Sequence, residues 1–215
     1  MQYDVVIIGA GPAGLFAANE IAEQSKMKTL VVDMGRDVKE RMCPASMYKA
    51  CNNCAPCSIM CGIGGAGTLS SGLLNLRPDI GGNLSQLLGD EKKAWELVNY
   101  VDEIFLENGA PKKVYDSGQG EAEDLERRAA AVGVQFIPIR QRHIGTDNAP
   151  KVIQNLEDKL KAIGVTFQLK TRISKIDAGA ITLEKGSKIK CEYILAAPGR
   201  AGANWLAAEA RRLKI

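Results

Sequence analysis

A glycine turn set between two apolar segments constrains this chain more than any other feature. The turn has the pattern G-x-G-x-x-G at 9–14 and directly follows an apolar run at 4–8. A second apolar run at 29–33 ends in Asp33. Strand, glycine turn, helix and a strand with an acidic end are typical of the βαβ unit that binds dinucleotides. The sequence therefore predicts an α/β, Rossmann-like fold, with a central parallel sheet that carries helices on both faces.

This unit predicts a site for the pyrophosphate of a dinucleotide. Gly9 permits the tight turn, Gly11 lets the backbone approach the phosphates, and Gly14 lets the helix pack closely on the strand. The helix offers free N–H groups and the positive end of its dipole to an anion. Asp33 can accept hydrogen bonds from ribose hydroxyls, and its charge disfavours a 2′-phosphate. The predicted cofactor-binding residues of this unit are Gly9, Gly11, Pro12, Ala13, Gly14, Asp33 and Met34.

A second glycine-rich segment lies further along the chain. Five glycines fall within 62–72, so the backbone N–H groups there can wrap an anion or lie against a planar ring. A flexible loop without a ligand is the alternative. The predicted contacts in this segment are Gly64, Gly65, Ala66 and Gly67. Arg41 precedes the segment and could reach a phosphate or adenine, or lie in a solvated loop.

Charge and hydropathy exclude two classes of partner. The chain has 28 basic and 25 acidic residues, a net charge of +3, and its basic residues are spread rather than clustered. This distribution argues against a nucleic-acid-binding protein. No apolar run approaches the length that crosses a bilayer, so we expect a cytoplasmic protein without a membrane partner.

The cysteines are concentrated in one segment. Cys191 stands apart in an apolar strand and is expected in the core, whereas the other five are predicted as metal ligands: Cys43, Cys51, Cys54, Cys57 and Cys61. The spacing from Cys51 to Cys61 is that of a ferredoxin ligand run, which favours a [4Fe-4S] cluster with Cys61 or Cys43 as the fourth ligand. Gly62 replaces the proline that usually follows such a run. A redox-active pair of Cys54 and Cys57, a zinc site and unliganded thiols remain alternatives.

The rest of the chain fits one domain over 1–215. Within it we expect a Cys/Gly-rich cofactor loop at 43–83 and a helical insertion at about 84–133. A strand is predicted at 134–139 and a helix at about 148–163. Short alternating segments from 165 to 197 indicate a small antiparallel meander, including separate strands at 188–191 and 193–197, the last of which returns to the parallel sheet.

The glycines alone do not decide between NAD and FAD, but the C-terminal third resembles the two-dinucleotide-binding-domain flavoproteins. More closely, the chain resembles the family of uncharacterised FAD-dependent dehydrogenases in the motifs at 64–67, 143–147 and 197–205. The resemblance covers nearly the whole chain. It implies that FAD is the cofactor, that the backbone near Ile173 faces the adenine, and that the turn carrying Ala197 and Gly199 closes over FAD.

Two departures from this family matter. Ser71 and Leu73 stand where the family usually has Asp and Lys. Members of the family also continue well beyond the position of Ile215. The expectations are therefore a fragment, a subunit whose substrate domain is supplied by a second polypeptide, or a protein with a simpler role. A surface exposed in this way could also support an oligomer.

The function predicted is that of an FAD-dependent oxidoreductase of the dehydrogenase type, or its FAD-binding subunit. Two-electron chemistry would take place at the flavin, with NAD(P)H or a redox protein as electron donor and a cysteine-ligated cluster as relay. An electron-transfer or nucleotide-binding module without its own substrate site is the alternative. Catalytic residues are not identified; His143, Cys54 and Cys57 are weak candidates.

Overall fold

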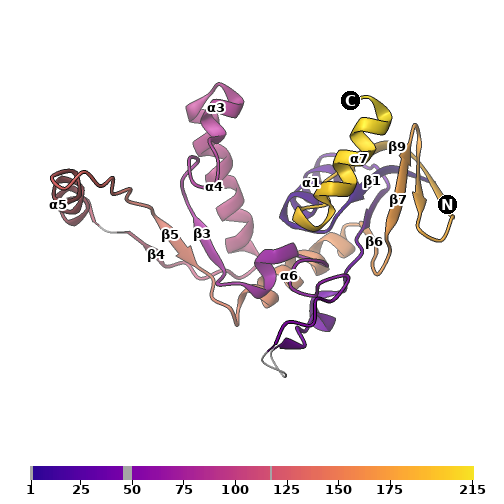
Figure 1. The fold of residues 1–215 in the computed structure, drawn as a ribbon, viewed down its shortest axis with the longest axis horizontal. Coiled ribbons are helices and arrows are strands. Elements are labelled where there is room, and N and C mark those ends of the chain that lie inside the picture. Colours follow the sequence, from indigo (N-terminus) through magenta and orange to yellow (C-terminus); the bar gives the residue numbers. More distant parts are fainter. Residues whose placement is uncertain (1, 46–49, 117) are drawn as a thin grey trace. The chain divides into compact units, whose positions relative to one another are not determined.

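A computed structural model describes residues 2–45, 50–116 and 118–215 (Figure 1). The chain forms two compact units. Unit 1 combines two separate stretches, Met1–Leu69 and Ile153–Ile215, and unit 2 consists of Ser70–Val152. Among the described helices, none is long and apolar enough to cross a membrane.

Unit 1 is built on a six-stranded sheet with the order β6-β2-β1-β9-β8-β7. Four strands are parallel, and their bounds are β6 (Thr166–Gln168), β2 (Thr29–Val32), β1 (Gln2–Ile8) and β9 (Lys188–Ala196). The last two, β8 (Ala180–Leu183) and β7 (Ile173–Asp177), are antiparallel. The predicted βαβ unit is confirmed, because β1 and β2 pair in parallel with α1 (Pro12–Gln24) between them in the chain.

Strand β9 joins the parallel and antiparallel parts of this sheet. It pairs in parallel with β1, from Gln2 opposite Lys190 to Ile8 opposite Ala196, and antiparallel with β8. The prediction of two strands, at 188–191 and 193–197, is therefore wrong. A single strand of nine residues can serve both neighbours because its two edges carry independent sets of backbone groups.

Strand β2 and most of β1 are buried on both faces of the sheet of unit 1. Side chains alternate along each strand, so Val6 and Ile8 of β1 join a core cluster with Leu30, Ile181 and Cys191. Burial raises the pKa of the Cys191 thiol, and the predicted core position of this cysteine is confirmed. Helix α1 packs on β1 and β2. Further helical elements of this unit are η1 (Val38–Glu40), η2 (Gly65–Leu69), η3 (Arg200–Gly202), α7 (Ala203–Leu213) and most of α6 (Ala149–Ala162).

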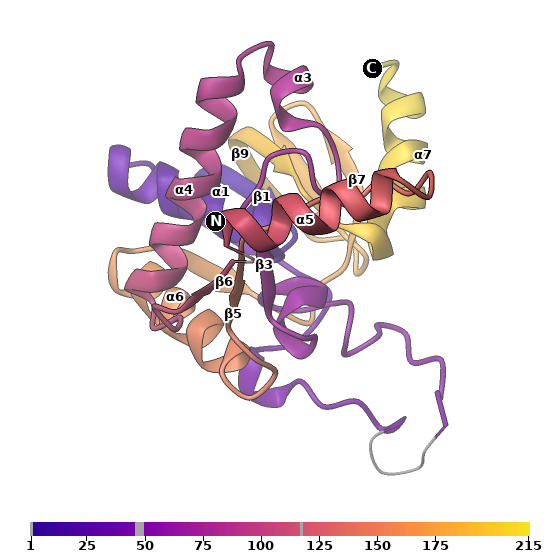
Figure 2. The ribbon, with the colours of Figure 1, turned by 90° about the vertical axis from the view of Figure 1, so that its left-hand side faces the viewer.

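The described residues of unit 2 form a small antiparallel sheet and three complete helices. The sheet has the order β3-β5-β4, with β3 (Leu73–Asn75), β5 (Gln141–His143) and β4 (Val114–Tyr115). The helices are α3 (Leu84–Leu88), α4 (Glu91–Glu107) and α5 (Gln119–Ala130), and α3 folds back beside α4 (Figure 2). The strand predicted at 134–139 is wrong, since 134–140 has no regular structure. Val134 there is 58% exposed, so its apolar character does not reflect burial in a sheet.

Candidate nucleotide site

The glycine turn after β1 is packed so tightly that two of its glycines are required by the protein itself. Gly9 has φ +105°, and a Cβ there would lie 2.2 Å from the carbonyl oxygen of Ala197. A Cβ on Gly14 would lie 1.9 Å from the carbonyl oxygen of Gly9. No side chain larger than hydrogen fits at either position. The predicted roles of these two glycines in turn and packing agree with this geometry.

Gly11 differs from these two glycines because nothing in the chain demands a glycine there. Its φ is −71°, which any residue can adopt, and a Cβ would meet no atom closer than the Cα of Gly65 at 4.0 Å. The space beside Gly11 is open, and the residues that follow, Pro12 and Ala13, are exposed. A glycine retained where the protein has room for a side chain fits a position that a ligand approaches closely.

The N-terminus of α1 is equipped to receive an anion. Gly11 is its N-cap, no side chain caps it, and its first turn contains no acidic residue. The free N–H groups of the first turn and the positive end of the helix dipole therefore face a position without a competing carboxylate from this helix. A phosphate group is the ligand that such a helix end favours.

Asp33, directly after β2, connects three backbone segments. Its Oδ2 accepts a hydrogen bond from the N–H of Ala10 at 2.8 Å, and its Oδ1 accepts from Gly35 at 2.7 Å and Gly62 at 2.8 Å. These bonds join the first glycine turn to the second glycine-rich segment. A carboxylate has about four acceptor positions, so Asp33 keeps capacity for a ribose hydroxyl beside this structural role.

The second glycine-rich segment is packed against the first. The N–H of Gly64 donates to the carbonyl of Ala10 at 2.8 Å, and a Cβ on Gly65 would lie 3.1 Å from the Cα of Gly11. Gly64 and Gly65 are buried, whereas Ala66 and Gly67 are exposed in η2. The predicted contacts Gly64 and Gly65 therefore lie beside the turn at 9–14, and the segment is not the flexible loop of the alternative interpretation.

Arg41 fixes the segment that leads into this loop. Its side chain is buried, and its guanidinium donates to the carbonyls of Ser58 (2.9 Å), Ile59 (2.7 Å), Ile63 (2.6 Å) and Gly65 (2.8 Å). Burial lowers the pKa of Arg41, and the nearby Asp33 acts in the opposite direction. Most of its N–H groups are engaged by backbone. Sequence analysis considered Arg41 as a phosphate or adenine contact and missed this role, because no pattern marks an arginine that binds carbonyls.

A cavity of about 490 Å³ lies at the carboxyl ends of β1 and β2, entirely within unit 1. It brings together predicted residues from four segments, namely Gly9, Asp33, Met34, Cys54, Cys57, Cys61 and Ile173. Sequence analysis missed Arg172 and Arg200, which line the cavity as its two cations beside the single carboxylate of Asp33. Ala197 and Gly199 do not line it, although Pro198 between them does. An excess of positive charge suits an anionic ligand.

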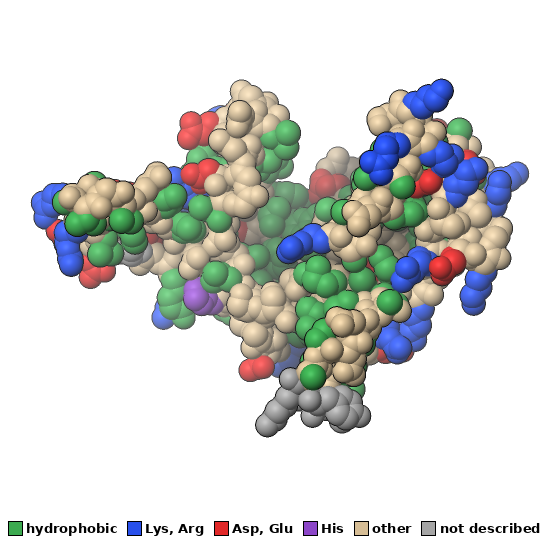
Figure 3. Space-filling model, in the orientation of Figure 1, with side chains coloured by type: hydrophobic (Ala, Val, Ile, Leu, Met, Phe, Trp, Pro, Cys, Tyr) green, Lys and Arg blue, Asp and Glu red, His purple; other side chains and the backbone are tan. Residues whose placement is uncertain are grey.

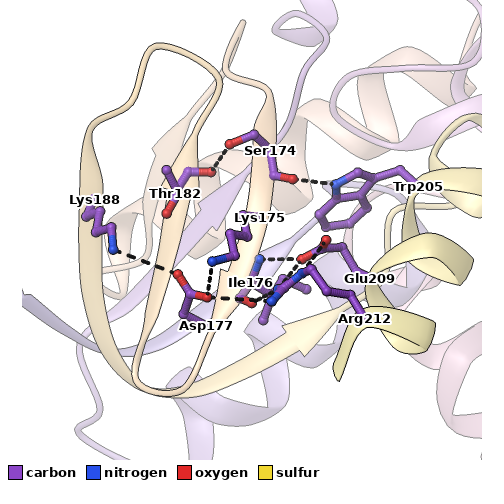
Figure 4. A network of polar contacts seen from close by, with 9 residues as sticks. All are labelled: Ser174, Lys175, Ile176, Asp177, Thr182, Lys188, Trp205, Glu209 and Arg212. Carbon is purple, nitrogen blue, oxygen red and sulfur yellow. Dashed lines mark hydrogen bonds and ion pairs between the residues drawn. The ribbon is translucent and has the colours of Figure 1, made fainter. Parts of the chain in front are cut away.

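The wall formed by α7 is held by a polar network on β7 (Figure 4). Trp205 lines the cavity, and its Nε1 donates to the carbonyl of Ser174 at 3.1 Å. One turn further, Glu209 accepts from the N–H of Ile176 at 2.7 Å and binds Arg212 through both carboxylate oxygens. Arg212 also donates to the carbonyl of Ile176. Since β7 lies at the edge of its sheet, these contacts cover backbone groups that would otherwise be unpaired.

The five clustered cysteines do not assemble into a metal centre in the described part of the chain, where no group of three or more His, Cys, Asp or Glu side chains could hold an ion. None of the five forms a disulfide bond in the described structure. Cys54, Cys57 and Cys61 line the cavity, whereas Cys43 and Cys51 do not. The predicted [4Fe-4S] cluster therefore has no support in these residues.

His143 belongs to unit 2 and is not among the residues of the cavity. It is the only histidine of the chain and is exposed in β5 (purple in Figure 3). Its ring lies 4.5 Å from that of Tyr115, centroid to centroid, in a tilted arrangement. An aromatic contact on an exposed strand gives His143 a packing partner, and its candidacy as a catalytic residue stays a prediction.

Comparison with known proteins agrees with this fold. A family model described as pyridine nucleotide-disulphide oxidoreductase matches residues 3–67. Glycine oxidase from Geobacillus kaustophilus is a solved structure with 16% identity and a TM-score of 0.55, matched over 100% of this chain and 59% of its own. The solved structure of 3-ketosteroid-delta4-(5alpha)-dehydrogenase from Rhodococcus jostii RHA1 has 17% identity and a TM-score of 0.57. The match covers 99% of this chain and 49% of the dehydrogenase chain.

A third solved structure, NikD, an unusual amino acid oxidase essential for nikkomycin biosynthesis, has 14% identity and a TM-score of 0.52, over 96% of this chain and 54% of its own. No curated protein matches the chain. These likenesses confirm the predicted α/β, Rossmann-like fold. The chain spans between about half and three fifths of the length of these structures.

Proposed function

We propose that this chain is the FAD-binding part of an FAD-dependent oxidoreductase. The observation that carries the proposal is Gly11, a glycine that neither backbone conformation nor packing requires, at the uncapped N-terminus of α1. A pyrophosphate at this helix end would use the free N–H groups and the open space together. The match of residues 3–67 to a nucleotide-dependent oxidoreductase family supports the same assignment.

The cavity then receives the adenosine end of the cofactor. In Rossmann-like folds the ribose hydroxyls bind the acidic residue at the end of the second strand, which is Asp33 here. Met34 and Ile173 supply apolar surface for the adenine in the same cavity. Arg172 and Arg200 add positive charge near the phosphates. When bound, FAD supplies two-electron transfer at its ring, while these residues bind and orient its ADP half.

A nucleotide-binding or electron-transfer module without a substrate site is the second candidate. It is favoured by one observation: the residues assembled in unit 1 account for the ADP half of the cofactor. Such a module would bind ADP and FAD alike. It would not reduce bound FAD with NAD(P)H, one of the two kinds of electron donor proposed for the enzyme.

The first experiment is a titration of the purified protein with FAD and with ADP, together with its visible absorption spectrum. FAD binding with flavin bands that NADPH bleaches under anaerobic conditions supports the oxidoreductase. Binding of FAD that no nicotinamide donor reduces supports the module. Iron and a broad shoulder that dithionite bleaches would restore the cluster. Absence of binding for both nucleotides would overturn the proposal.

The Gly11→Ala variant tests the observation itself. Because the added Cβ meets no atom closer than 4.0 Å and φ is −71°, the variant should fold with unchanged stability. Its affinity for ADP should nevertheless fall by about tenfold or more, since the methyl group occupies the approach of the pyrophosphate. Gly120→Ala is the matched control, because a Cβ there also meets nothing within 4 Å and the residue lies in α5 of unit 2. Equal affinities in both variants would contradict the assignment.

A further inference from the structure

The cysteine segment forms one wall of the adenosine cavity. Four consecutive residues, Cys54-Ala55-Pro56-Cys57, all line it, followed by Met60 and Cys61. The same cavity is lined by Asp33 and Met34, which follow β2. Cys54, Cys57 and Asp33, whose carboxylate is proposed to bind the ribose, therefore line one shared cavity.

Backbone bonds fix this wall to the nucleotide motif. The N–H of Cys61 donates to the carbonyl of Cys57 at 2.9 Å, and the N–H of the next residue, Gly62, donates to Asp33 at 2.8 Å. Arg41 holds the intervening Ser58 and Ile59 by their carbonyls. The position of Cys57 relative to Asp33 is thus determined by an unbroken series of hydrogen bonds, rather than by a free loop.

Of the three cysteines that line the cavity, two are accessible to a reagent that enters it. Cys61 is 6% exposed, and burial raises the pKa of its thiol, so it is held as an unreactive thiol. Cys54 is exposed and Cys57 is partly exposed. The thiolate of an accessible cysteine is the form that attacks a disulfide. Arg172 and Arg200 favour an anionic reaction partner in the same cavity.

We propose that Cys54 and Cys57 form a thiol-modification site for small anionic disulfides, and that this modification and nucleotide binding exclude each other. The proposal rests on the proposed function, because it takes the cavity as the adenosine site. It differs from a redox relay to the flavin: the two cysteines line the same cavity as Asp33, the residue proposed to bind the ribose, and the modification controls occupancy by the cofactor.

The chemistry is thiol–disulfide exchange. The Cys57 thiolate attacks one sulfur of the disulfide, a bond forms between Cys57 and that sulfur, and the other half leaves as a thiolate. Cys54, three residues away, can then attack the Cys57 sulfur and release the second half. The two protein thiols lose two electrons and two protons in total, and the small disulfide is reduced to two thiols.

Either product competes with the nucleotide. A mixed disulfide places the attached group in the cavity, and a bond between the two cysteines draws together a wall whose four residues all face it. Because binding effects are reciprocal, a bound nucleotide must disfavour the modification at equilibrium by the same factor by which the modification weakens nucleotide binding. Both directions can be measured on the same protein.

The test uses glutathione disulfide as the anionic probe and ADP as the nucleotide. Modification of each cysteine is followed over time by peptide mass spectrometry, with and without saturating ADP. Modification of Cys54 and Cys57 should slow about tenfold or more in the presence of ADP. Cys51 is the internal control, because it is exposed but does not line the cavity, and its rate should change less than about twofold. Equal protection of all three cysteines, or none, would overturn the proposal.

The reverse experiment measures ADP affinity after complete modification. Affinity should fall about tenfold or more and return when dithiothreitol removes the modification. The double variant Cys54→Ser/Cys57→Ser, treated identically, should keep the affinity of its untreated form. If ADP binds the unmodified protein and modification leaves the affinity unchanged, the modification site is wrong while the proposed function stands. If ADP binds neither form, the proposed function fails, and the inference with it.

Discussion

Glu157 is a carboxylate that unit 1 buries completely, and it provides a pH-dependent element of stability. It is 0% exposed in α6, and its Oε1 lies 2.5 Å from the Nζ of Lys161. Burial raises the pKa of Glu157 from its ordinary value, the nearby Asp37 adds to this increase, and Lys161 opposes it without cancelling it. An acid whose pKa is raised by folding stabilises the protein below its ordinary pKa of 4.5 and loses that contribution as pH rises through the raised value.

The Glu157→Gln variant should remove this dependence. As pH rises above the ordinary value of 4.5, the free energy of unfolding of the unmodified protein should decline relative to that of the variant, as measured by urea unfolding at several pH values. Glu96→Gln is the control, because Glu96 lies on α4 with its side chain 51% exposed and should leave the pH profile unchanged. Parallel profiles for Glu157→Gln and the unmodified protein would show that the buried carboxylate titrates normally.

For single residues, the sequence predicted which ones lie at the cavity better than it predicted which hydrogen bonds they form. The glycine pattern and its position after a strand were sufficient to place Gly9 and Asp33 at the cavity, because chain order fixes which strand ends meet at one sheet edge. The hydrogen bonds of Asp33 and Arg41 join positions up to 29 residues apart in the sequence. Such bonds depend on the folded path of a loop that has no periodicity, so no local pattern predicted them.

At the scale of elements, α7 is the helix whose docking matters most for the cavity. Glu209 accepts from the N–H of Ile176 and binds Arg212, and these bonds hold the pKa of Glu209 at about 2, below its ordinary 4.5. A lowered pKa means that the stabilisation is present above pH 4.5 and is lost as pH falls toward about 2. Trp205 stands one turn earlier on the same helix and lines the cavity.

Replacing Glu209 by alanine should therefore lower both the free energy of unfolding and the affinity for ADP. The unpaired N–H of Ile176 should cost about 1–3 kcal/mol in unfolding free energy, and ADP affinity should fall by a few fold because α7 is no longer held on β7. Thermal unfolding and ADP titration measure both effects. Arg211→Ala, an exposed change on the same helix, should alter neither. Unchanged ADP affinity in a destabilised Glu209→Ala variant would show that the wall does not depend on this network.

The pattern of apolar residues predicted some strands of this protein correctly and others wrongly. The buried strands β1 and β2 are short apolar runs bounded by turn residues, and such runs are reliable because both faces of a parallel strand are covered. The segment 134–139 has the same apolar character without a partner strand. Strand formation requires a neighbour as well as a pattern, and the neighbour of any segment is decided by the tertiary fold.

At the scale of the whole chain, the division into two units predicts independent responses to mutation. Unit 1 is assembled from residues at both ends of the sequence, since β1 pairs with β9. Unit 2 depends on Arg142, whose side chain is 4% exposed and binds both oxygens of Asp102 at 2.6 and 2.7 Å and the carbonyl of Pro111 at 2.6 Å. Sequence analysis did not predict this arrangement, because the pair joins residues 40 positions apart.

Asp102→Ala should unfold unit 2 selectively. Removing one partner of a buried ion pair costs about 3–5 kcal/mol because it leaves an unpaired charge, so limited proteolysis within 70–152 should accelerate about tenfold or more. ADP affinity should change less than about twofold, since the cavity is lined only by residues of unit 1. Asp124→Ala, which removes an exposed pair with Arg127 on α5, is the control and should leave the proteolysis rate unchanged. If ADP affinity fell in step with the cleavage of unit 2, the two units would form one cooperative structure.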